Sequence, residues 1–316
     1  MTALSCAMSA STGAPDRTVR SQSASRNRWV ARGWRAARQS AVGWGHVMNA
    51  RTPVRHHLVL WAAALLTPAV FLVPVGFVAR RGYTGESDLV VASESGFIRA
   101  DLSRPVTDSP SLAELTAVWR EFHLVKALIA GLLVLALVGL ASTVRRRVEA
   151  AGRGRRRLLL VAYGAVVVWL LGALTVLLAN VQGAAAPFAS VASLLPPGHA
   201  SGELSGVLGQ LRRAVEAGAP SPAGGIAREL HGDFTLYHAV FAVLAAVTGV
   251  ALVSLALRAA RRRWRLRGSS RSADPTWLVQ TTLYGAAGGL FLVLSLANAS
   301  TWMHPVPALL ASLGGS

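Results

Sequence analysis

The chain has 316 residues, of which 53% are hydrophobic and 15% are charged, and its formal net charge is +18. Ordinary soluble domains carry about 25% charged residues, so this composition excludes that class and indicates a membrane protein. The single cysteine, Cys6, excludes an intramolecular disulfide and any metal site built from several cysteines.

The basic residues are concentrated in three segments. Residues 1–57, 145–157 and 258–274 together hold 23 Arg and 3 acidic residues, whereas the rest of the chain holds 9 Lys or Arg and 11 Asp or Glu. Basic residues that flank membrane spans stay on the cytoplasmic side. The distribution therefore predicts a cytoplasmic N-terminus and an extracytoplasmic C-terminus. It also explains the positive charge without a nucleic-acid partner.

Residues 1–57 form a basic tail. Its Arg- and Ser-rich, acid-poor composition fits an organelle transit peptide, but the residue usage of the whole chain favours a bacterial genome. In that case Met48 is a candidate for the native start. Residues 28–44 place Arg and apolar side chains on opposite sides of a helix, a pattern typical of a helix on an anionic membrane surface. A disordered tail is the alternative.

Five apolar runs are long enough to cross the hydrocarbon core, which takes roughly 20 helical residues. They cover residues 58–79, 124–144, 158–180, 235–257 and 278–297. Pro68 and Pro74 predict a kink in the first, which we interpret as an uncleaved anchor. Gly285 and Gly289 have the GxxxG spacing that favours close packing of the last. The predicted fold is all-α, a five-helix transmembrane bundle of one entry helix and two helical hairpins.

The two predicted hairpins share a series of sequence landmarks. Residues 114–196 open with ELTAVWREFH and residues 229–316 with ELHGDFTLYH, and each opening has Glu nine residues before His. A triple Arg and a Tyr-Gly pair follow in both. Each then has Asn seven residues before Pro, at Asn180 and Asn298. The conserved order of these landmarks within the chain indicates an internal repeat whose two copies have the same topology.

Two connecting segments, residues 80–113 and 197–228, are predicted to lie on the outer side. Ser111 and Glu114 have the spacing of a capping box, which predicts a helix of about 30 residues that continues into the second span. The second segment contains ELSGVLGQLRRAVEAG, whose apolar residues follow one face of a short amphipathic helix. Neither segment is apolar enough for a separate domain, so we expect a small cap on the bundle.

The repeat makes His123 and His238 equivalent, each at the outer end of a span after an aromatic residue. Such a pair could bind a transition metal or haem iron, or sense pH. Simple anchoring at the membrane interface is favoured, because no HxxxH, HxH or CxxC spacing is present. Asn180 and Asn298 are candidates to cap helices or to complete a polar ring with the histidines. Lys126 is interpreted as reaching the lipid headgroups.

No Walker, GxSxG or HExxH motif is present, and the spans lack the mid-membrane carboxylates of ion-coupled transporters. The segments RTPVRHHLVLW, REFH, LYH and LANVQGAAAPFAS resemble the multi-pass integral membrane proteins of actinobacteria that have no assigned activity. The resemblance covers residues 50–316. It implies a plasma-membrane location and carries over no functional residues.

These observations together predict a non-enzymatic interaction or structural protein with an extracytoplasmic cap and no cofactor. The expected partners are the lipid bilayer and either an envelope protein or a second copy of the chain. A metal- or haem-binding carrier or redox component that uses His123 and His238 is the alternative. A small-molecule permease is a weaker one.

Overall fold

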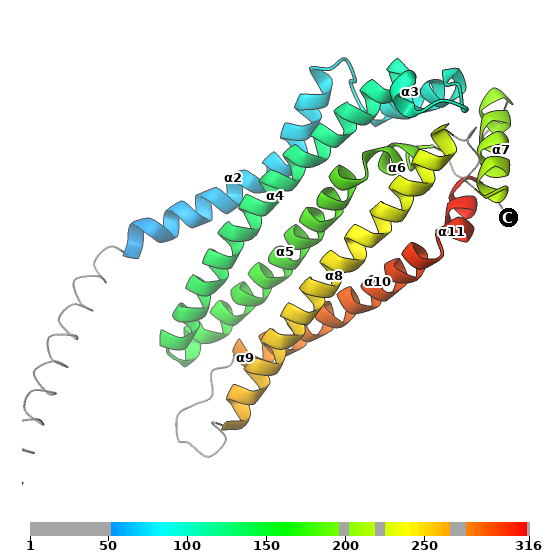
Figure 1. Cartoon of the computed structure of the whole chain (residues 1–316). Coiled ribbons are helices and arrows are strands. Elements are labelled where there is room, and N and C mark those ends of the chain that lie inside the picture. Colours follow the sequence, from blue (N-terminus) through cyan, green and yellow to red (C-terminus); the bar gives the residue numbers. More distant parts are fainter. Residues whose placement is uncertain (1–51, 196–201, 219–224, 266–275, 315–316) are drawn as a thin grey trace, which may run out of the picture. The chain divides into compact units, whose positions relative to one another are not determined.

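The computed structural model describes residues 52–195, 202–218, 225–265 and 276–314, and within these ranges all regular structure is helical (Figure 1). The chain divides into two units, residues 1–55 and 56–316, and all contacts below lie in the second. The tail up to residue 51, with Met48 and the predicted surface helix at 28–44, lies outside the described residues. The elements are α2 (Thr52–Ala79), α3 (Glu86–Arg99), η1 (Val106–Asp108), α4 (Pro110–Ala150), α5 (Arg153–Ala185), α6 (Pro187–Ala192), α7 (Gly202–Glu216), α8 (Gly225–Arg265), α9 (Thr276–Val279), the π-helical η2 (Gln280–Tyr284), α10 (Gly285–Met303) and α11 (Pro305–Ser312).

In the described part of the chain, five helices are long and apolar enough to span a membrane, as predicted. They are α2, α4, α5, α8 and the continuous run from α9 to α10. Many of their large apolar side chains are exposed, among them Leu72, Leu135 and Val161. Exposure of so many apolar side chains to water would be unfavourable in free energy, whereas their contact with lipid tails is not. The fold is therefore an all-α membrane protein.

Two of these helices are longer than the sequence predicted. α4 and α8 each have 41 residues, or about 60 Å at 1.5 Å per residue, so both extend well beyond a hydrocarbon core of about 30 Å. The capping-box prediction was wrong, because α4 begins at Pro110 and its N-cap residue, Ser109, makes no side-chain cap bond. Proline suits the first helical position, since the backbone N–H it lacks has no helical partner there.

The helices pair as two hairpins, α4 with α5 and α8 with α10, and α5 joins the hairpins by packing against α8 (Figure 1). The close approach between α8 and α10 is made by Gly249 and Gly288. A Cβ on Gly288 would lie 2.9 Å from Val253 N and 3.0 Å from Gly249 O. Of the predicted GxxxG pair, a Cβ on Gly285 would lie 3.8 Å from Ala256 of α8, whereas a Cβ on Gly289 would meet open space.

The entry helix α2 contains Pro68 and Pro74 in its interior. It packs against the first hairpin through small and β-branched side chains, with Ala63 and Val70 buried beside Ala130 of α4. Each interior proline removes a backbone donor, and neighbouring groups must compensate for it in the membrane.

A cap covers the end of the hairpins away from the Arg-rich turns (Figure 1). We use this name for α3, η1, α6, α7 and α11 together with the first turns of α4 and α8. One buried cluster unites it and includes Phe97, Leu112, Leu211, Leu230 and Leu309. The predicted amphipathic helix is α7, which buries its apolar face there. The segment before α4 adds α3, which was not predicted. Since α4 and α8 supply part of this core, the connecting segments rely on the span helices for their packing.

Candidate functional site

His123 of α4 is held by two hydrogen bonds at the base of the cap. Its Nδ1 lies 2.9 Å from Asn180 Oδ1 on α5, and its Nε2 lies 3.1 Å from Ser190 Oγ on α6. Gly183 leaves the room for the ring, because a Cβ there would come within 2.7 Å of His123 Cε1. The side chain is partly buried, and its polar atoms point between helices.

The neighbours of His123 determine which ring nitrogen carries the proton. The Asn180 amide nitrogen donates to Val176 O (2.7 Å), so Asn180 Oδ1 faces the ring and His123 Nδ1–H donates to it. Trp119 Nε1–H donates to Ser190 Oγ (2.9 Å), whose own hydrogen is then free to reach His123 Nε2. A hydroxyl can accept and donate at once. The network is satisfied by a neutral histidine with its proton on Nδ1.

His238 of α8 makes the equivalent first contact in the second hairpin. Its Nδ1 lies 2.8 Å from Asn298 Oδ1 on α10, and the Asn298 amide nitrogen donates to Leu294 O (2.8 Å). Both predicted Asn candidates thus hydrogen-bond between helices. Each histidine takes the asparagine of its own hairpin, so in the described residues the hydrogen bonds form two separate pairs and no ring of four.

Among the described residues, the rest of the His123 network has no counterpart around His238. Phe234, four residues before His238, takes the place of Trp119 and packs on the imidazole at a centroid distance of 4.5 Å. Ala308, three residues after Pro305, takes the place of Ser190, three residues after Pro187. The second hairpin therefore lacks both the indole donor and the hydroxyl.

Metal binding would compete with these hydrogen bonds. In the described part of the chain no group of three or more His, Cys, Asp or Glu side chains could hold a metal ion. Binding through Nδ1 would cost either histidine its asparagine bond, and binding through Nε2 would separate His123 from Ser190. A bis-imidazole site would thus have to replace contacts already made.

Three polar contacts that join the hairpins and the cap were missed at the sequence level. Asp233 Oδ2 accepts from Ala189 N (2.9 Å) at the start of α6, and Glu229 Oε2 accepts from Val106 N (2.9 Å) in η1. Gln182 Nε2 donates to Tyr237 O (3.1 Å). In each of these contacts the donor and the acceptor lie far apart in the chain. No short sequence spacing could therefore have predicted the pairs.

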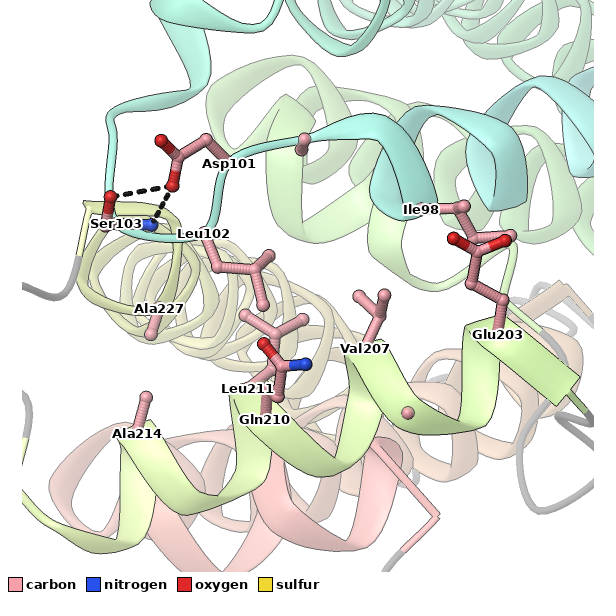
Figure 2. A pocket seen from close by; sticks show the side chains of 12 residues that line it. Ile98, Asp101, Leu102, Ser103, Glu203, Val207, Gln210, Leu211, Ala214 and Ala227 are labelled. Carbon is pink, nitrogen blue, oxygen red and sulfur yellow. Dashed lines mark hydrogen bonds between the residues drawn. The ribbon is translucent and has the colours of Figure 1, made fainter.

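The cap contains a pocket of about 720 Å³ between α7, the start of α8 and the segment that joins α3 to η1 (Figure 2). Its apolar wall includes Ile98, Leu102, Val207 and Leu211, with Glu203 at the rim. Figure 2 shows these apolar side chains directed toward one another across the space.

Asp101 stiffens the other rim of this pocket. It accepts from Ser103 Oγ (2.7 Å) and Ser103 N (3.0 Å). These hydrogen bonds, the side-chain one first, hold the pKa of Asp101 below its ordinary value, and Arg104 adds to the effect. Asp101 therefore stays ionised down to a lower pH than a free carboxyl. The pocket combines an apolar wall with two carboxylates at its rim, Asp101, which pairs with Arg104, and Glu203.

Comparisons of the chain with protein-family models, curated proteins and solved structures found no match.

Proposed function

We propose that this integral membrane protein is a non-enzymatic interaction component of the plasma membrane, whose extracytoplasmic cap binds a segment of another envelope protein. The pocket in the cap is the observation that carries the proposal. At about 720 Å³ it falls within the size range of specific binding pockets, roughly 300–1,000 Å³. The hydroxyl–imidazole pair of Ser190 Oγ and His123 Nε2 (3.1 Å) is not among the residues that line this pocket, which favours binding over catalysis there.

The lining of the pocket defines the chemistry of the partner. An apolar side chain fits against Val207 and Leu211, and a basic group fits beside Glu203 at the rim. Burial of the apolar group supplies affinity, whereas the Glu203 carboxylate selects for positive charge. The proposed occupant is accordingly a peptide segment with an apolar anchor next to Lys or Arg.

Photo-crosslinking in intact cells tests this proposal. Gly206 lines the pocket, and Gly232 is an exposed residue of α8 outside the lining; a Cβ at either position would meet open space. A photoreactive residue at 206 should trap one envelope protein, and the same residue at 232 should not. Glu203→Gln should weaken the adduct. Equal adducts at both positions, or no adduct at 206, would contradict the proposal.

The orientation and location of the protein belong to the same proposal. The Arg-rich turn between α4 and α5, and the Arg-rich C-terminal turns of α8, lie at one end of the hairpins, opposite the cap. The positive-inside rule supports a cytoplasmic position for that end and an extracytoplasmic cap. The resemblance to actinobacterial multi-pass membrane proteins supports the plasma membrane.

We also infer that the two hairpins are copies of one ancestral unit. His123 and His238 both lie thirteen residues after the first residue of a 41-residue helix, Pro110 or Gly225. The helix breaks before α6 and α11 have nearly the same backbone angles, φ −129° and ψ 70° at Ala186, and φ −133° and ψ 67° at the residue before Pro305. Matched His–Asn bonds add a third correspondence.

The second candidate function is a metal- or haem-binding redox or carrier protein. The equivalent positions of His123 and His238 favour it, and their existing hydrogen bonds weigh against it. Absorption spectra and metal analysis of the wild type and of the His123→Ala/His238→Ala variant decide between the two functions. A Soret band or a stoichiometric metal that disappears in the double variant would replace the preferred proposal.

A further inference from the structure

An apolar crevice of about 320 Å³ lies between α2, α4 and α5, within the membrane-spanning part of the first hairpin. Val70, Phe71, Leu133, Trp169 and Ala173 contribute to its wall. The hydroxyl in the wall, on Thr67, already donates to Ala63 O (2.7 Å). The crevice thus presents hydrocarbon surface to whatever enters it.

Two features of the sequence favour an open crevice. α2 has Pro68 and Pro74 in its interior, Pro68 directly after the lining residue Thr67, and interior prolines favour a kink. On the opposite side Gly172 of α5 leaves a gap, because a Cβ there would have no heavy atom within 4 Å. A cavity with only apolar walls is poorly suited to water. In a bilayer, a lipid chain is the available molecule that matches it.

A cation stands at the end of the crevice nearer the cap. Lys126 lies one helical turn before Ala130, which lines the crevice, and its Nζ lies 5.8 Å from the ring centre of Phe71, also in the lining. Its Nζ is also 5.3 Å from the ring centre of Phe122. The ammonium is therefore held over aromatic faces beside the opening.

No carboxylate neutralises Lys126 within the described residues. The ion pairs there join Arg81 to Glu121, Arg104 to Asp101 and Arg145 to Glu149. Lys126 is also the one lysine of the whole chain, which otherwise uses arginine. A half-buried, unpaired cation near the end of a span is placed to meet a phosphate group.

The depth of these groups matches the shape of a phospholipid. Along α4, Leu133 lies seven residues beyond Lys126, about 10 Å deeper at 1.5 Å per residue. A headgroup on the ammonium would thus leave its acyl chain level with the crevice. We propose that this crevice is a binding site for one anionic phospholipid, with its phosphate on Lys126 and one acyl chain between α2, α4 and α5.

Native mass spectrometry of the full-length protein in mild detergent, with added phosphatidylglycerol or phosphatidylcholine, tests the site. We expect one phosphatidylglycerol to be retained about fivefold more strongly than phosphatidylcholine, the factor that corresponds to ~1 kcal/mol for one lysine near anionic lipid. Lys126→Gln should abolish this preference, and Lys126→Arg should keep it. Equal retention of both lipids by the wild type would overturn the proposal, as would a preference that survives Lys126→Gln.

A larger side chain that fills the crevice provides an independent test of the proposal. Gly172→Leu should lower retention of both lipids at least about tenfold, since loss of only two buried CH₂ contacts accounts for such a factor. Gly289→Leu is the matched control, because Gly289 is also a span glycine with open space at its Cβ, far from the crevice lining. Unchanged retention in Gly172→Leu would show nonspecific lipid adhesion. If this variant unfolds, the Lys126 pair decides the question alone.

Discussion

At the scale of single residues, the two histidines differ although their positions correspond. His123 bonds to Asn180 and Ser190, and Trp119 orients the serine. His238 keeps the asparagine bond, but a phenylalanine and an alanine stand where Trp119 and Ser190 stand in the first hairpin. The imidazole of His123 is therefore part of the packing between α4, α5 and α6, and its removal leaves buried polar groups behind.

We predict that His123→Ala lowers the free energy of unfolding more than His238→Ala does. The first change strands two buried partners and should cost about 2–3 kcal/mol, because an unsatisfied buried polar group costs about 1–3 kcal/mol. The second removes one interhelical bond, for which about 1 kcal/mol is expected. Equilibrium unfolding in detergent micelles measures both. An equal or larger loss for His238→Ala would contradict this assignment of roles.

At the scale of elements, glycines and a carboxylate determine how helices meet. The α8–α10 crossing depends on Gly249 and Gly288, whose backbones are in direct contact. The α6 start depends on Asp233 of α8, which accepts from Ala189 N. Neither interaction follows from the sequence of one helix by itself.

Adjacent glycines of α10 should respond in opposite ways to alanine. Gly288→Ala places a methyl group against backbone atoms of α8 and should destabilise the protein by about 1–3 kcal/mol. Gly289→Ala meets open space and should be neutral or stabilising by up to about 1 kcal/mol, since alanine favours the helix. Melting temperatures in micelles report the difference. A tolerated Gly288→Ala would show that the helices do not approach as closely as described.

The carboxylate of Asp233 should be replaceable by an amide but not by a methyl group. Asp233→Asn keeps an oxygen acceptor for Ala189 N, whereas Asp233→Ala removes it and should cost about 1 kcal/mol, as loss of a helix cap does. Limited proteolysis near α6 and the unfolding midpoint measure the effect. If both variants lose the same stability, charge rather than the hydrogen bond is the important property.

At the scale of the whole molecule, the Arg-rich turns and the cap lie at opposite ends of the hairpins (Figure 1). This separation makes the orientation experimentally accessible. Each end offers an exposed position for labelling, Val91 on α3 in the cap and Gly154 at the start of α5.

We predict that the cap faces outward. In a Cys6→Ser background, Val91→Cys should react with a membrane-impermeant maleimide in intact cells, whereas Gly154→Cys should react only after permeabilisation. The reason for this expectation is the positive-inside rule, since arginines flank Gly154. The opposite labelling pattern would reverse the orientation and move the cap pocket to the cytoplasmic side.

The sequence by itself determined the fold class, because five apolar runs of span length leave no soluble alternative. It also identified the four residues that pair, because His123 and Asn180 occupy the same landmarks in the first repeat as His238 and Asn298 do in the second. Tertiary structure alone decided what those residues do. The same sequence spacings are compatible with one ring of four polar side chains and with two separate His–Asn pairs. Only the packing of α4 on α5 and of α8 on α10 distinguishes the two arrangements.

Tertiary structure likewise decided the extent of α4 and α8, the cap core and both cavities. The apolar pattern of the sequence predicts the part of a helix that lies in the membrane. Beyond the membrane, a helix continues where other segments of the chain cover its apolar face. Phe97, Leu211 and Leu309 come from distant parts of the chain and become one core only when α4 and α8 bring them together. Local sequence thus specified which segments enter the membrane, whereas contacts between distant segments specified the surfaces available for binding.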